Sequence, residues 1–239
     1  MEDKFIFTYK KLKSYFQEAL NNGYKVITCH EYLDYKKENR TDKIIVNRVD
    51  IDLSCKKAKL TADLFNELNL KATFFIRLHA DEYNPFSFEN YRILRDIRDK
   101  GHEIGYHSEV IDQSTIWDED AAACLKRDIE ILNRMLDIKI TGVASHGGKT
   151  GWNNLDFWKD RSPAEFDVLY EAYDTKPEFD LFNNSLYISD SGWIHWKCYN
   201  NGVVVPDDFR SLGEHCREGH QIIYSLVHPD NQYVEHCYE

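Results

Sequence analysis

The sequence has little of the residues that make chains irregular, since only 5 of its 239 residues are proline and 11 are glycine. This scarcity argues against a loop-rich or collagen-like protein. It also lacks an apolar stretch of about 18 residues, so we expect no transmembrane helix. The first four residues, MEDK, are not the start of an export signal, and we therefore expect a cytoplasmic location.

Positive charge is scarce as well. The 30 lysines and arginines are outnumbered by 41 aspartates and glutamates, which gives a net charge of −11. Nucleic acids and anionic membrane surfaces both require a basic face, so we expect neither as a partner. The six cysteines include no C-x-x-C pair, and without an export signal they are expected to be reduced, mostly buried thiols.

What remains is typical of a folded, water-soluble protein, with 42% hydrophobic, 30% charged and 14% aromatic residues. The aromatic content favours a rigid body with aromatic-lined pockets. No repeat or flexible linker divides the chain. We predict a short N-terminal extension over residues 1–42, beginning with a helix over 8–22, and one domain over residues 43–239.

From residue 43 onward, apolar runs alternate with amphipathic segments. The predicted strands are 43–51, 71–76, 102–106, 140–145, 185–189 and 220–227. The predicted helices are 55–69, 88–99, 118–136, 163–173 and 207–217. Strands that alternate with helices predict an α/β fold with a mainly parallel sheet, either open or closed into a barrel.

A chemically versatile side chain follows the end of every predicted strand. In order along the chain these are Asp50 and Asp52, Arg77 and His79, His107, His146, Asp190, and His228. The carboxyl ends of parallel strands meet on one face, where ligands bind. Polar residues are common where loops begin, but that explanation is weak for six consecutive strands. The pattern predicts a functional site at this face.

Asp50 and Asp52 are two residues apart on a strand, so both side chains point to the same side. Two such close carboxylates repel each other unless a cation or a shared proton offsets the repulsion. Together with imidazole ligands they indicate Zn²⁺ or a similar divalent metal. One aspartate can instead be a ligand and the other a general base. The alternative is that Asp50 forms a buried ion pair with Arg48 or Arg77.

Four segments resemble one known family: VDIDLS (49–54), KATFFI (71–76), KGHEIGYHSE (100–109) and SLVHPD (225–230). Over residues 43–230 the chain resembles the polysaccharide deacetylase superfamily, the NodB-homology domain of carbohydrate esterase family 4. The Asp-x-Asp spacing, Ser145-His146 and Ser189-Asp190-Ser191 are similar to the branch found with surface-polysaccharide and O-antigen biosynthesis. The resemblance implies a distorted (β/α) barrel and a metal-dependent hydrolase that removes an N-acetyl group from an amino sugar.

The resemblance also implies roles for single residues. Asp52 and His107 match metal ligands, Asp50 takes the place of the catalytic base, and His228 matches the general acid. Ile111 stands where the family has its second ligand histidine. Our hypothesis is that His146 replaces that ligand and completes a site for a divalent metal, for which we expect Zn²⁺, while His79 and Glu109 are the alternatives.

Further residues are expected at the rim of the same face. The candidate substrate contacts are Arg77, His79, Asn84, Trp152 and Asp190; Trp152 either stacks on a sugar or packs in the core. The remaining histidines are expected to be structural: His30, His102, His195, His215, His220 and His236.

The expected substrate is a small or carrier-linked amino-sugar precursor in the cytoplasm. Two alternatives remain open: a non-catalytic metal- or sugar-binding protein on the same scaffold, and a hydrolase of another non-peptide C–N bond.

Overall fold

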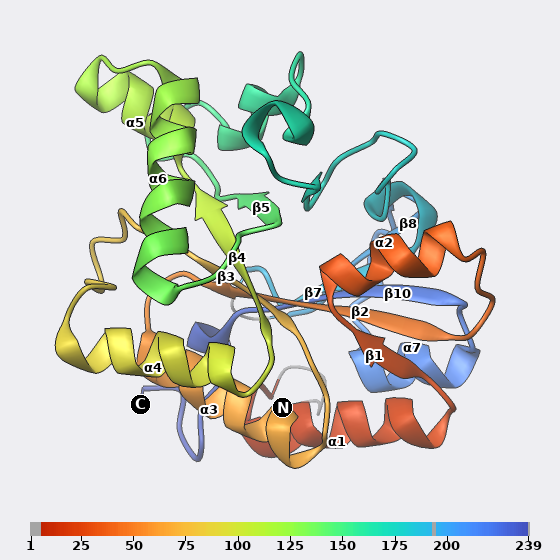
Figure 1. The fold of residues 1–239 in the computed structure, drawn as a ribbon. Helices are drawn as coiled ribbons and strands as arrows, with labels where there is room; N and C mark the ends of the chain where they lie inside the picture. Colours follow the sequence, from red (N-terminus) through yellow and green to blue (C-terminus); the bar gives the residue numbers. More distant parts are fainter. Residues whose placement is uncertain (1–5, 193–194, 239) are drawn as a thin grey trace.

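The strands of the chain form one sheet in the order β6-β5-β4-β3-β2-β10-β7-β8-β9, with β1 beside β2 (Figure 1). The computed structural model describes residues 6–192 and 195–238. The strands are β1 (Lys25–Ile27), β2 (Ile44–Ile51), β3 (Thr73–Ile76), β4 (Glu103–Ser108), β5 (Gly142–Ser145), β6 (Tyr170–Glu171), β7 (Leu186–Ser189), β8 (Lys197–Asn200), β9 (Val203–Val204) and β10 (Ile222–Val227). Among the described strands, only the β7–β8 and β8–β9 pairs are antiparallel. The predicted α/β fold with a mainly parallel sheet is confirmed.

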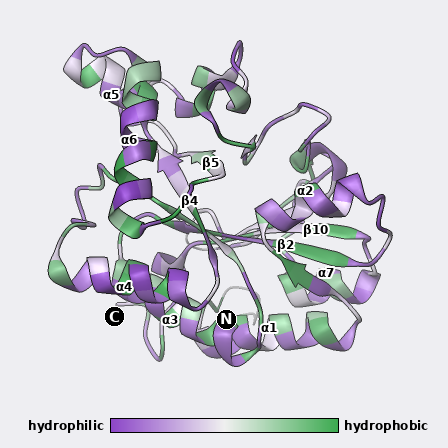
Figure 2. Cartoon of the chain, viewed as in Figure 1, coloured by the Kyte–Doolittle hydropathy of each residue, from purple (hydrophilic) through white to green (hydrophobic). Residues whose placement is uncertain are grey.

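Helices cover both faces of the sheet, which explains why most residues of its central strands are buried. The helices are α1 (Tyr9–Asn21), α2 (Cys29–Lys37), α3 (Cys55–Glu67), α4 (Phe88–Asp99), α5 (Val110–Trp117), α6 (Ala121–Leu136) and α7 (Leu212–Glu218). Every residue of β2, β3, β5 and β7 is buried. In Figure 2 strands β2 and β10 are largely green, whereas the helices alternate green with purple. Among the described residues, no helix is both long and apolar enough to cross a bilayer.

The two faces of the sheet belong to two separate cores. Side chains from α1, α3, α4, α6 and α7 pack on one face. Those of α2 pack on the other face, with rings from β3, β6, β7 and β10. β1 pairs with the first half of β2, from Ile44 to Val46, so part of the predicted N-terminal extension is built into the sheet.

The sheet curls so that β6 and β7 approach each other at a seam formed by Tyr173 and Tyr187. Their hydroxyl oxygens are 3.0 Å apart, and the Tyr224 hydroxyl donates a hydrogen bond of 3.2 Å to the carbonyl oxygen of Ala172. No backbone pairing joins β6 to β7 within the described ranges. The barrel is therefore incomplete, and side chains rather than a strand ladder bridge its gap.

The predicted helix over 163–173 is wrong. A 3₁₀ turn covers Pro163–Phe166, Asp167 follows with a left-handed φ of 56°, and the chain then extends into β6. Tyr170 at the start of β6 is fully buried and stacks on Phe179 at 4.6 Å. Packing of this ring in the inner core outweighs the weak helical pattern of the segment. The N-terminal extension was predicted to contain a helix and a strand, and it contains α1 and β1. The short strands β8 and β9 and the helices α2 and α5 were not predicted.

Candidate functional site

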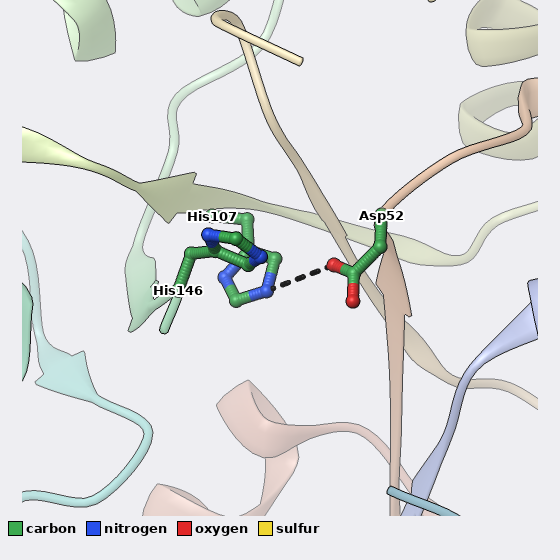
Figure 3. A group of neighbouring side chains, drawn as sticks. All are labelled: Asp52, His107 and His146. Carbon is green, nitrogen blue, oxygen red and sulfur yellow. Dashed lines mark ion pairs between the residues drawn. The ribbon is translucent and has the colours of Figure 1, made fainter. Parts of the chain in front are cut away.

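Three of the expected metal ligands meet at the carboxyl end of the sheet. Asp52 follows β2, His107 lies in β4 and His146 follows β5, and one ligand atom of each lies within 4.8 Å of the others. Figure 3 shows the two imidazole rings next to each other and the Asp52 carboxylate facing His107. Neighbouring parallel strands end at the same edge, which is why residues 94 positions apart converge here.

The hydrogen bond of His107 defines which of its nitrogens is free. Nδ1 lies 2.8 Å from the carbonyl oxygen of Ala144, and because a carbonyl can only accept, Nδ1 carries the hydrogen. Nε2 then faces Asp50 Oδ2 and Asp52 Oδ1, each 3.3 Å away. Burial disfavours the imidazolium, but both carboxylates outweigh it and raise the pKa of His107. The site therefore favours positive charge at this point.

The spacing of these atoms fits a metal better than a hydrogen bond. Hydrogen bonds between nitrogen and oxygen are usually about 2.7–3.2 Å long. Two ligand atoms on a tetrahedral Zn²⁺ with bonds of about 2.0–2.2 Å are about 3.3–3.5 Å apart. Asp52 Oδ1 and His146 Nδ1 are also buried with no hydrogen-bond partner among the described residues. The residues present fit a divalent metal.

Asp50 is held by its neighbour two residues earlier on β2. Arg48 donates to both carboxylate oxygens, with Nε–Oδ1 of 2.8 Å and Nη2–Oδ2 of 2.7 Å. Burial raises the pKa of Asp50, but the guanidinium outweighs it and lowers the pKa below its ordinary value. The alternative of an Arg48–Asp50 ion pair is thus what the structure contains, and Oδ2 still borders His107.

Arg77 is buried and positions two parts of the site. Its Nη1 donates 2.8 Å to the backbone oxygen of Asp52, and its Nη2 donates 2.7 Å to Glu109 Oε1. Glu109 Oε1 lies 3.4 Å from His146 Nδ1. Burial opposes the charge, but His146 and Arg77 lower the pKa of Glu109 to about 2. Ile111 lies in the first turn of α5, where its backbone N–H donates to Asn154.

His228 reaches the site from the end of β10 and is oriented by Asp190. Its Nδ1 lies 2.6 Å from Asp190 Oδ1, and its Nε2 lies 3.8 Å from Asp52 Oδ2. Burial lowers the pKa of His228, but Asp190 outweighs burial and raises it to about 9. Asp190 is 0% exposed and also accepts from the backbone N–H of His228 and from Gln232. Asp190 was expected to contact substrate, and the structure shows its carboxylate bonded to His228.

Two adjoining cavities open beside these side chains. The polar cavity, of about 320 Å³, is lined by charged groups that include Asp52, Arg77, His146, His228 and Asp230. The aromatic cavity, of about 540 Å³, is lined by the rings of Tyr173, Phe182, Tyr187 and Tyr199 together with Lys197. Ser191 lines both cavities. A ligand can therefore span from the charged side chains to the seam.

Sequence reasoning missed Asp230, which lines the polar cavity. Its Oδ2 accepts a 2.9 Å hydrogen bond from the backbone of Leu53, while its Oδ1 is buried with no described partner. Burial, reinforced by nearby Asp52, raises the pKa of Asp230 to about 6. Its position at the end of SLVHPD, two residues after His228, was the available signal.

Other expected contacts lie elsewhere. His79 Nε2 is 3.0 Å from Asp128 Oδ2 and its ring packs on Trp117, so it lies outside the Asp52–His107–His146 group and lines neither cavity. Asn84 uses its side-chain oxygen to accept from Phe86. Trp152 is 63% exposed, so the expectation that it packs in the core is wrong. It lines neither of the two cavities.

No protein-family model and no curated protein matches this sequence. In fold, the chain is similar to a mutant of a CE4-family pseudoenzyme with restored enzymatic activity, at 14% identity and a TM-score of 0.46, covering 80% of this chain and 58% of that one. It is also similar to the Streptococcus pyogenes deacetylase PplD in complex with acetate, at 12% identity and a TM-score of 0.45, covering 59% and 63% of the two chains. The chitin deacetylase of Colletotrichum lindemuthianum aligns at 15% identity and a TM-score of 0.39, covering 75% and 84%. The chain thus spans less than two thirds of the first two structures.

Proposed function

We propose that this chain is a divalent-metal-dependent hydrolase that removes an N-acetyl or similar acyl group from an amino sugar. The observation that carries the proposal is the meeting of Asp52, His107 and His146 beside Asp50 and His228. The resemblance of the segments around Asp52, His107 and His228 to the polysaccharide deacetylase superfamily supports the substrate class. An acyl-sugar precursor of surface polysaccharides is the substrate that this resemblance favours.

The ligands of the metal would be Asp52, His107 Nε2 and His146. A divalent metal in such a site supplies Lewis acidity, which activates water and polarises an amide carbonyl. The chain prepares this site in two ways. Ala144 fixes the His107 tautomer so that Nε2 presents its lone pair, and Arg77 holds the backbone of Asp52 in place.

Two side chains move the protons of the reaction. Asp50, kept ionised by Arg48, accepts a proton from the water that attacks the acyl carbon. His228, kept protonated by Asp190, donates a proton to the departing amine. The amide C–N bond breaks, a C–O bond forms, and the products are the carboxylate of the acyl group and a free amino sugar. Asp230 is the second candidate for the base because its Oδ1 has no described partner.

The aromatic cavity gives the substrate a binding surface next to the reacting groups. The rings of Tyr173, Tyr187 and Tyr199 line this cavity and would contact a sugar, and Lys197 offers a cation for the phosphate of a carrier-linked sugar. The acyl group would then lie in the polar cavity, with Ser191 between the two.

Metal content and acetate release together test the proposal. We expect His107→Ala and His146→Ala each to lose one metal ion per chain and to lose acetate release from N-acetyl amino sugars. Asp50→Asn is expected to keep the metal and lose about 10²–10⁴-fold in turnover. Asp230→Asn is the matched control, expected to remain within about tenfold of the unaltered protein.

The opposite results would assign other roles. Full turnover in Asp50→Asn with loss in Asp230→Asn would move the base to Asp230. Sugar binding without acyl release from any N-acyl sugar would favour the non-catalytic sugar-binding alternative. This alternative arises because Ile111 stands where the family has its second ligand histidine. Retention of metal in both histidine variants would refute the ligand set.

A further inference from the structure

A second cluster of ligand-type side chains lies on the opposite face of β8 from the aromatic cavity. Cys198 belongs to β8, Asp208 to the connection after β9, and His215 to α7. One ligand atom of each lies within 4.8 Å of the others. Lys197 and Tyr199 line the aromatic cavity, and because side chains alternate along a strand, Cys198 between them points away from it. The cluster is therefore separate from the proposed catalytic site.

His215 has an environment that a neutral imidazole cannot satisfy. Its side chain is 1% exposed, and neither ring nitrogen has a hydrogen-bond partner among the described residues. Nε2 lies 3.5 Å from Asp208 Oδ1, and Nδ1 lies 3.6 Å from Glu218 Oε2. A neutral imidazole has one N–H and one lone pair, so in either tautomer a lone pair faces a carboxylate. A cation between Nε2 and Asp208 removes this conflict when Nδ1 keeps its hydrogen toward Glu218.

The spacing of His215 and Asp208 is that of two ligands around one ion. Ligand atoms of a tetrahedral Zn²⁺, with bonds of about 2.0–2.3 Å, are about 3.3–3.8 Å apart. The 3.5 Å between His215 and Asp208 falls in this range, beyond a normal hydrogen bond. Arg210 donates from Nε to Asp208 Oδ1 at 2.9 Å and from Nη2 to Oδ2 at 2.6 Å, and its backbone N–H donates to Oδ1 at 3.2 Å. These bonds orient the carboxylate and leave a lone pair free on Oδ2.

We propose that Cys198, Asp208 and His215 bind a divalent metal of the zinc class at a structural site that ties the edge strand β8 to helix α7. A thiolate, an imidazole and a carboxylate favour Zn²⁺ or Co²⁺ over Mg²⁺ or Ca²⁺. The thiolate is the ligand form, so binding releases the Cys198 proton to solvent. His215 was expected to be only structural, because it lies within a helix and not at a strand end.

Cobalt substitution distinguishes this site from the catalytic one, since only this site contains sulfur. We expect Co²⁺ added to the apo protein to produce a near-ultraviolet thiolate-to-cobalt charge-transfer band that saturates by two equivalents in the unaltered protein and by one equivalent in His107→Ala. His107→Ala should keep the band, and so should Cys237→Ser, which removes the exposed cysteine. Cys198→Ser should abolish the band and lower the bound metal by one ion per chain, while its circular dichroism remains that of the unaltered protein.

Asp208→Asn provides a second variant that keeps the thiol. It should weaken Co²⁺ binding at this site by at least about tenfold while the band remains at saturation. The proposal is overturned if the unaltered protein shows no thiolate band, if the band survives Cys198→Ser, or if Cys237→Ser removes it. If His107→Ala loses the catalytic metal and keeps the band, the two sites bind metal independently, as proposed.

Discussion

The pairing of His228 with Asp190 predicts a large change in one ionisation when the carboxylate is replaced. Burial alone would lower the pKa of His228, yet neighbouring carboxylates, Asp190 foremost, raise it from 6.5 to about 9. At about 1.4 kcal/mol per pKa unit, this rise corresponds to about 3 kcal/mol in favour of the imidazolium. Asp190→Asn preserves size and removes the charge. We expect the pKa of His228 to fall to about 7 or below, because burial then acts against weaker opposition.

The assay is an NMR titration of the His228 ring in metal-free protein, beside the unaltered chain and Asp63→Asn. Asp63 lies in α3, where its carboxylate pairs with Lys100, so this variant has the same change of net charge at a distance. It should leave the pKa of His228 unchanged. If the pKa of His228 stays near 9 in Asp190→Asn, the reasoning is refuted. The raised pKa would then be due to the carboxylates of Asp52 and Asp50.

The same pair makes folding stability depend on pH. A group whose pKa is raised by folding stabilises the native state fully below its unfolded pKa, near 6.5, and this contribution disappears as the pH rises through about 9. The unaltered protein should therefore lose about 3 kcal/mol of unfolding free energy between pH 6 and pH 10 from this group. Asp190→Asn should lack that loss in urea titrations at the two pH values.

Three other perturbations have defined outcomes. Gly142→Ala places a Cβ 1.9 Å from Tyr170 Cζ and should lower the free energy of unfolding by about 1–3 kcal/mol, whereas Gly147→Ala, which meets nothing within 4 Å, should be neutral in the same urea titration. Arg48→Met leaves Asp50 as an unpaired buried charge and should cost about 3–5 kcal/mol by chemical denaturation, and a loss below 1 kcal/mol would contradict the ion pair. Chelation should lower the melting temperature, by the equivalent of about 2.7 kcal/mol when the removed metal had been at 100 times its Kd, and a melting temperature unaffected by chelator and by added Zn²⁺ would contradict metal binding.

The parts of the fold that sequence predicted well are those with long, fully buried strands. β2 is predicted over 43–51 and observed as Ile44–Ile51. Its apolar residues point to both faces of the sheet, a pattern that is typical of a buried strand. β6 has two residues and no periodic pattern. Its existence depends on where the Tyr170 ring packs, which is a tertiary property that no local pattern contains.

The convergence of site residues was predictable because parallel strands end together, but the partners of each side chain were not. Arg48 and Arg77 were both candidates for the ion pair with Asp50, and only the structure assigns Arg48 to it and Arg77 to Glu109. The burial of Asp190 was likewise not predictable from the sequence. A residue just after a strand can point toward the solvent or back onto a neighbouring strand, and the sequence is the same in both cases.

The seam at Tyr173 and Tyr187 differs from the rest of the sheet in the way its two sides are joined. Elsewhere the sheet is joined by backbone hydrogen bonds, which every residue type except proline can make. At the seam the join consists of two hydroxyl-bearing rings that also line the aromatic cavity. Substitutions there alter the shape of the cavity without removing a backbone hydrogen bond. Tyr187 is only 5% exposed and packs against Phe182, Tyr199 and Tyr224. A change of cavity shape at the seam is therefore coupled to the packing of the inner core.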